Sequence, residues 1–113
     1  MSNCNKELVE LLNSMDEYIK SGEKILENSN VNEEFTEGMN AFVEGFIMVE
    51  KVIKEHSKKL NAITLGEKNK LAEGLESSIE KINSNKEYLL NDYLECVVEP
   101  FIKWKSVILN NIL

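Results

Sequence analysis

Residues 91–113, NDYLECVVEPFIKWKSVILNNIL, are the most apolar stretch of the sequence and contain its only proline and its only tryptophan. Apolar residues recur around this stretch at intervals of three and four, the spacing that places side chains along one side of an α-helix. They are Leu90, Leu94, Val97, Phe101, Trp104 and Ile108. A second apolar row lies beside the first, so we expect neighbouring helices to cover this helix on more than one side.

Pro100 interrupts the helix predicted here. It has no N–H to donate to the carbonyl of Cys96, and its ring crowds that carbonyl. We therefore expect a kink or a one-turn loosening between Cys96 and Pro100. Two interpretations follow: a helix that bends around a core, or a hinge that lets residues 101–113 swing out to a partner.

The composition favours one all-α domain that spans residues 1–113. Apolar residues make up 42% of a 12.9 kDa chain, which is enough for a genuine core. One proline and five glycines leave few positions to punctuate strands. We expect an antiparallel four-helix bundle, and the alternative is a three-helix bundle with a long kinked C-terminal helix.

Two long helices are predicted in the first half of the chain. The first covers residues 5–28, with Ser2 or Asn3 as its N-cap. Its buried face consists of Leu8, Leu12, Met15, Ile19, Gly22 and Leu26. The second covers residues 31–60, with Asn30 as its N-cap. Its apolar stripe consists of Phe35, Met39, Phe42, Phe46, Val49, Ile53, His56 and Leu60. Gly38 and Gly45 lie beside this stripe, and we expect a neighbouring helix to approach closely there.

Two more helices are predicted in the second half. Residues 61–64 are expected to form a turn, and Thr64 with Glu67 has the form of a capping box that opens a third helix. Residues 83–85, Asn-Ser-Asn, are expected to end that helix, and a fourth begins there. If the third and fourth helices instead ran on as one, the chain alone could not cover it, and a dimer would be implied.

The charge pattern excludes several classes of partner. The formal net charge is −7, and all 13 basic residues are lysine. Without arginine or a basic face, nucleic-acid binding is disfavoured. No apolar stretch is long enough for a membrane span, and no signal peptide is evident. Cys4 and Cys96 stand alone, which is typical of reduced thiols, so we expect a cytoplasmic protein.

His56 is the only histidine, and this limits the chemistry that the chain can perform. A ferritin-like di-iron site needs a histidine on each of two helices, and a zinc HExxH site needs two histidines on one helix. Nucleotide-binding and catalytic motifs are also absent from the sequence. We therefore predict no cofactor, no metal and a non-catalytic role.

One catalytic alternative remains open at His56. A lone histidine on a helix of a small acidic bundle is the form of a histidine phosphotransfer domain, with His56 as the phosphoacceptor and Lys59 three residues on. The residues at +2 and +4, Lys58 and Leu60, depart from the motif H-x-L-K-G. The other interpretation is a partly buried structural histidine on the apolar stripe.

The wide apolar arc of residues 101–113 suggests an interface as well as a core. Phe101, Trp104, Ile108 and Ile112 are the candidate residues for binding a protein partner or a second copy of the chain in a homodimer. We accordingly interpret the chain as a cytosolic interaction module, either an adaptor or a helical chaperone of the kind found in bacterial secretion or motility systems.

The spacing of Asp92, Leu94, Glu95, Pro100 and Trp104 resembles a pattern in small uncharacterised helical proteins of Bacillus- and Clostridium-type bacteria. The resemblance covers about a fifth of the chain and implies no known activity. It marks Asp92 and Glu95, one turn apart on the polar side of the helix, as further candidate contacts to a partner.

Overall fold

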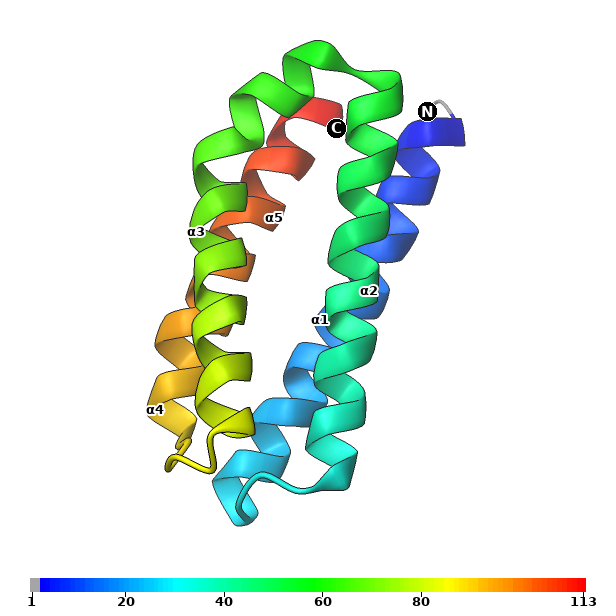
Figure 1. Cartoon of the computed structure of the whole chain (residues 1–113). Coiled ribbons are helices and arrows are strands. Elements are labelled where there is room, and N and C mark those ends of the chain that lie inside the picture. Colours follow the sequence, from blue (N-terminus) through cyan, green and yellow to red (C-terminus); the bar gives the residue numbers. More distant parts are fainter. Residues whose placement is uncertain (1–2) are drawn as a thin grey trace.

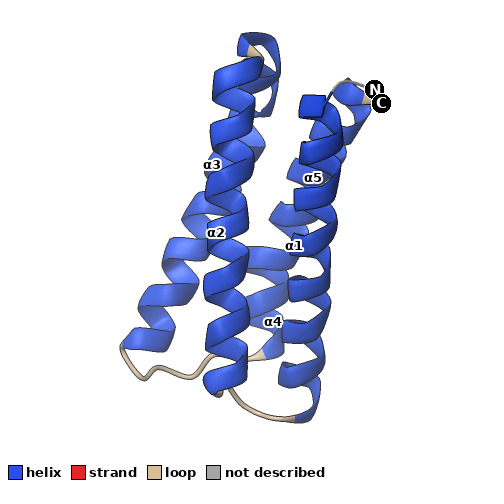
Figure 2. Cartoon of the chain, turned by 90° about the vertical axis from the view of Figure 1, so that its right-hand side faces the viewer, coloured by secondary structure: helices blue, strands red, loops and turns tan. Residues whose placement is uncertain are grey.

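The computed structural model describes residues 3–113, which form helices joined by short connections (Figure 1). The elements are α1 (Asn3–Asn28), α2 (Glu33–His56), α3 (Lys58–Asn83), α4 (Leu90–Tyr93), the π-helical turn η1 (Leu94–Val98) and α5 (Glu99–Ile112). No β-strand occurs within residues 3–113, as Figure 2 also shows. Because α4, η1 and α5 follow one another without a break, they form a single C-terminal helix, residues 90–112.

The expected all-α four-helix bundle is confirmed, and the three-helix alternative is wrong because residues 84–89 separate α3 from the C-terminal helix. The chain forms two hairpins, α1 with α2 and α3 with the C-terminal helix, whose loops lie at the same end of the bundle (Figure 1). The turn between α2 and α3 lies at the opposite end. The start of α1 and the end of α5 meet there too, where Asn5 Nδ2 donates to the Ile112 carbonyl at 3.3 Å.

The helix boundaries around Ser57 differ from the prediction. Ser57 has an extended conformation (φ −155°, ψ 102°), which ends α2 at His56, and its Oγ accepts a hydrogen bond from the Leu60 N–H at 3.1 Å, which caps α3. The predicted turn at residues 61–64 is therefore wrong. Thr64 lies inside α3, where its buried hydroxyl donates to the Leu60 carbonyl at 2.9 Å instead of capping a helix.

Two other predicted helix starts are also displaced. Asn32, not Asn30, caps α2, because its Oδ1 accepts the Phe35 N–H at 2.8 Å. Asn85 adopts a positive φ of 57°, which continues the loop, so the C-terminal helix begins only at Leu90. Asn3 is the first residue of α1 rather than its cap, and Ser2 lies outside the described residues.

Aromatic rings from both hairpins meet in the core. The ring centroids of Phe42 and Phe101 are 5.1 Å apart, and Phe46 and Trp104 are separated by the same distance. Nearer the loops, Phe35 packs edge-on against Tyr93 at 5.3 Å. The predicted buried face of α1 is confirmed in full. Aromatic side chains of α2 and of the C-terminal helix therefore join the two hairpins.

The loosened turn expected before Pro100 is present and lies two residues earlier than predicted, at Leu94–Val98. Here the Glu99 N–H donates to the Leu94 carbonyl, five residues back, as in a π-helix. A Cβ atom added at Gly74 of α3 would collide with the Cys96 carbonyl oxygen in this turn. The missing N–H of Pro100 and the small size of Gly74 thus act at the same place, where α3 touches the widened helix.

The prediction of a close helix approach is confirmed for Gly45 and wrong for Gly38. A Cβ atom at Gly45 would come within 2.8 Å of Met15 Cγ on α1, whereas one at Gly38 would meet nothing within 4 Å. None of the helices in residues 3–113 combines the length and the apolar character needed to cross a membrane.

Candidate interaction surfaces

Three of the predicted partner-binding residues lie in the core. Phe101, Trp104 and Ile108 have no exposed surface. Their burial follows from the ring contacts with α2 and from the position of α5 against α3. Ile112 is half-buried near the end of α5. A partner could reach the first three side chains only if α5 left the bundle.

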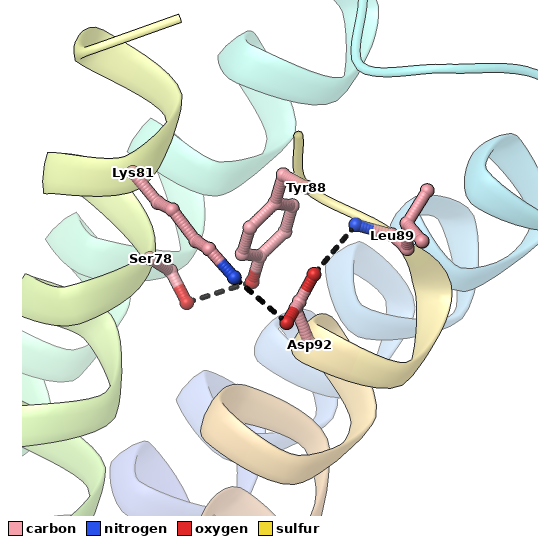
Figure 3. A network of polar contacts seen from close by, with 5 residues as sticks. All are labelled: Ser78, Lys81, Tyr88, Leu89 and Asp92. Atoms are coloured by element: carbon pink, nitrogen blue, oxygen red, sulfur yellow. Dashed lines mark hydrogen bonds and ion pairs between the residues drawn. The ribbon is translucent and has the colours of Figure 1, made fainter. Parts of the chain in front are cut away.

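Asp92 is held in a polar network that anchors the loop of residues 84–89 (Figure 3). Its Oδ2 accepts the Leu89 N–H at 2.8 Å, at the start of α4, and its Oδ1 lies 3.0 Å from Lys81 Nζ on α3. The backbone hydrogen bond and then the lysine hold the pKa of Asp92 below its ordinary value. Glu95, one turn later, is exposed.

Tyr88 is the second anchor of the same loop. Its hydroxyl lies 2.7 Å from the Ser78 hydroxyl on α3, and both side chains are buried. Burial raises the pKa of Tyr88 to about 12. Figure 3 shows Tyr88 and Asp92 reaching α3 from the two ends of one short segment. The network therefore has a structural role, and Asp92 is already engaged within the chain.

His56 is exposed, in contrast to the predicted partly buried position on the apolar stripe. The reason is that α2 ends at His56, so the side chain lies beyond the last covered turn. His56 and Lys59 line an open cleft of about 440 Å³ at the end of the bundle that carries both termini. Cys4 lines it as well, and burial, followed by Glu7, raises the pKa of its thiol, which favours the neutral form.

A second groove lies between α2 and α3, with a volume of about 470 Å³. Its lining residues define what we call the α2–α3 groove: Phe46, Ile47, Glu50, Lys51, Lys54, Glu55 and Lys68. Ile47 is 59% exposed in the middle of a long helix. Leu65, 47% exposed, lies one turn from Lys68 on α3. Ile47 therefore lies in a groove that also contains three lysines, and Leu65 lies one turn away from its α3 side.

The lysines of the α2–α3 groove differ in their pairing. Lys68 Nζ lies 3.4 Å from Glu50 Oε2, across the two helices. Lys51 and Lys54 are both exposed, and neither forms an ion pair with any residue between 3 and 113. The two free ammonium groups are one turn apart on α2, so they present their charge along the same side of the groove.

Glu50 is the most unusual residue of the α2–α3 groove. Its exposure is only 7%, and neither carboxylate oxygen accepts a hydrogen bond from residues 3–113. A buried carboxylate is normally satisfied by several donors, since an unpaired one costs free energy. Among residues 3–113, only the ion pair with Lys68 compensates its charge. The Glu50 carboxylate oxygens can therefore still accept hydrogen bonds from a group that enters the groove.

The sequence pattern did not identify this groove. Ile47 and Leu65 fall outside the apolar stripes of their helices, and single exposed apolar residues are common on protein surfaces. Glu50 lies next to Val49 of the predicted stripe, and this adjacency was its only signal. The described residues contain no group of three or more histidine, cysteine, aspartate or glutamate side chains that could hold a metal ion.

Comparison of the chain with protein-family models, with curated proteins and with solved structures returned no match. The resemblance of residues 92–104 to small bacterial helical proteins therefore stays a prediction.

Proposed function

We propose that the protein is a non-catalytic protein–protein interaction module of the cytoplasm, an adaptor or a helical chaperone, which binds its partner along the α2–α3 groove. The observation that carries the proposal is the exposed Ile47 side chain in the groove, beside Lys51 and Lys54, which form no ion pair with residues 3–113. Leu65, also exposed, lies one turn from Lys68 of the same groove. Contiguous exposed apolar surface rimmed by polar groups is typical of docking sites.

The assignment to secretion or motility systems rests on size, acidity and architecture alone, so it is an analogy. The surface proposed for binding also differs from the one expected from the sequence. Phe101, Trp104 and Ile108 support the core beneath the surface, whereas Ile47 and Leu65 are free to contact a partner.

Site-specific photocrosslinking in the cells that express the protein tests this proposal. A photoreactive phenylalanine analogue replaces Ile47 or Leu65, and the same analogue at Tyr18, exposed on α1, serves as the control. We expect a defined cross-linked heterocomplex from positions 47 and 65 and none from position 18. Cross-links confined to a second copy would replace the adaptor role by a homodimer, and no cross-link at either groove position would overturn the proposal.

Histidine phosphotransfer is the second candidate function, and the exposure of His56 favours it. Lys59 lines the same cleft, which would place a positive charge near a phosphoryl group. The position of His56 on the last residue of α2 disfavours it, because this end of the helix carries a partial negative charge.

Phosphorus NMR after incubation with phosphoramidate tests the second candidate. A phosphohistidine signal that is present in the natural chain and absent from His56→Gln would support it. The same spectrum from both proteins would exclude His56 as the acceptor.

A further inference from the structure

We infer that the partner segment taken up by the α2–α3 groove is an acidic amphipathic helix. This inference rests on the proposed function and adds the chemistry of the partner. It is carried by the form of the groove, by the free lysines on its rim and by the unused acceptor capacity of Glu50.

The form of the groove fits a helix. The groove is bordered by two antiparallel helices that pack less closely with each other than α1 packs with α2. From Ile47 to Lys54 its wall on α2 extends for about two turns, or roughly 10 Å. Helices bind such grooves by inserting side chains spaced three and four residues apart. The exposed Ile47 side chain and the largely buried Phe46 beside it in the sequence supply the apolar lining for such insertion.

The charges of the groove favour an acidic partner. Its lining holds three lysines, Lys51, Lys54 and Lys68, against the carboxylates of Glu50 and Glu55. Glu50 and Lys68 compensate each other, which leaves Lys51 and Lys54 against Glu55. The chain as a whole carries −7, but charges farther away than about 8 Å are largely screened at physiological ionic strength. The three lysines and two glutamates give the lining a net positive charge, which favours an acidic helix.

Glu50 adds a requirement for a hydrogen-bond donor. Its buried oxygens line the groove and accept no hydrogen bond from residues 3–113, and Lys68 Nζ, 3.4 Å from Oε2, forms their one ion pair within that range. A partner side chain that brings an amide or hydroxyl group would therefore satisfy them. A nucleic acid fits this site poorly, because its phosphates would face Glu50 and Glu55 and would find no arginine.

Fluorescence anisotropy with two designed peptides tests the inference on the full chain. Both peptides are amphipathic helices of about five turns with leucine on one face and one central asparagine as a donor. One carries glutamate on its polar face, and the other carries lysine at the same positions. We expect the glutamate peptide to bind more tightly than the lysine peptide, and its affinity to fall as salt is added.

Charge reversal locates the binding. Lys51→Glu combined with Lys54→Glu is expected to weaken binding of the glutamate peptide about tenfold, as loss of two ion pairs and addition of repulsion would do. The matched control, Lys20→Glu combined with Lys24→Glu, makes the same change of net charge on exposed positions of α1. Circular dichroism confirms that both variants stay folded.

Three results would overturn the inference: no binding of either peptide, equal binding of both, or equal weakening by the two double variants. These results are distinguishable from failure of the proposed function. If positions 47 and 65 still cross-link a partner protein in cells, the groove is a docking site and only the acidic character of the partner is wrong.

Discussion

Two glycines of α3, Gly74 and Gly66, show where the absence of a Cβ atom matters for helix packing and where it does not. Gly74 lies against the Cys96 carbonyl oxygen of the widened turn, while a Cβ atom at Gly66 would meet nothing within 4 Å. Both residues carry the same entropic cost of glycine inside a helix. Only Gly74 has a structural reason for it, because the backbones of two helices meet there.

Alanine at these positions should therefore have opposite effects on the free energy of unfolding. Gly74→Ala forces α3 away from the C-terminal helix and is expected to cost about 3 kcal/mol. Gly66→Ala is expected to stabilise the fold by about 0.5–1 kcal/mol. Urea denaturation followed by circular dichroism measures both. Equal effects of the two substitutions would mean that the close approach at Gly74 has no energetic importance.

The two residues of the ion pair in the α2–α3 groove, Glu50 and Lys68, should differ in how much their replacement changes the free energy of unfolding. The Glu50 side chain is 9% exposed and accepts no hydrogen bond from residues 3–113, whereas the Lys68 side chain is 22% exposed and can reach water. Lys68→Met leaves a buried carboxylate uncompensated and is expected to destabilise the fold by about 2 kcal/mol. Glu50→Met removes the unsatisfied acceptor and is expected to be neutral or stabilising.

Thermal unfolding of the two variants, with the double variant to isolate their coupling, measures this difference. A larger loss from Glu50→Met than from Lys68→Met would show that Glu50 stabilises the free protein. In that case its carboxylate would have a structural role and would not indicate a missing partner donor.

At the scale of elements, the loop of residues 84–89 depends on the ionisation of Asp92. The Leu89 N–H and Lys81 lower the pKa of Asp92 in the folded chain, so its ionised form stabilises the fold. This contribution is complete above the unfolded pKa of about 4 and is lost as the pH falls through the lower folded pKa.

Asp92→Asn should accordingly make the free energy of unfolding less dependent on pH in the acidic range. We expect it to cost about 1 kcal/mol at neutral pH, as loss of a helix-start interaction does, and to leave little difference from the natural chain at pH values below the folded pKa. Glu95→Gln, an exposed carboxylate one turn later, is the matched control. Urea titrations across acidic pH measure both, and parallel profiles for the two variants would contradict the role of Asp92.

The sequence predicted some elements well and others poorly, for physical reasons. The buried face of α1 was predictable because one amphipathic period continues over the whole helix. The boundary at Ser57 was not, since a single non-helical residue leaves the apolar spacing from Ile53 to Leu60 and Thr64 unbroken. The α2–α3 groove depends on which face of α2 meets α3, a tertiary property that the pattern of either helix alone does not contain.

At the scale of the whole molecule, the two hairpins share one apolar core to which both contribute side chains. Phe42 and Phe46 of the first hairpin pack against Phe101 and Trp104 of the second. These rings and Ile108 are buried in the assembled bundle. Neither hairpin therefore has a complete apolar core of its own, and the bundle should unfold as one cooperative unit.

Removal of residues 101–113 tests this dependence and also separates the two interpretations of Pro100. If the C-terminal helix bends around a core, a chain that ends at Pro100 loses three fully buried side chains and is expected to lose cooperative unfolding altogether. A chain that lacks only Leu113, which is 74% exposed, should retain it. Circular dichroism with light scattering measures both folding and size. A folded monomer from the shorter chain would instead show that residues 101–113 form a detachable segment, and Phe101, Trp104 and Ile108 would again be candidates for a partner interface.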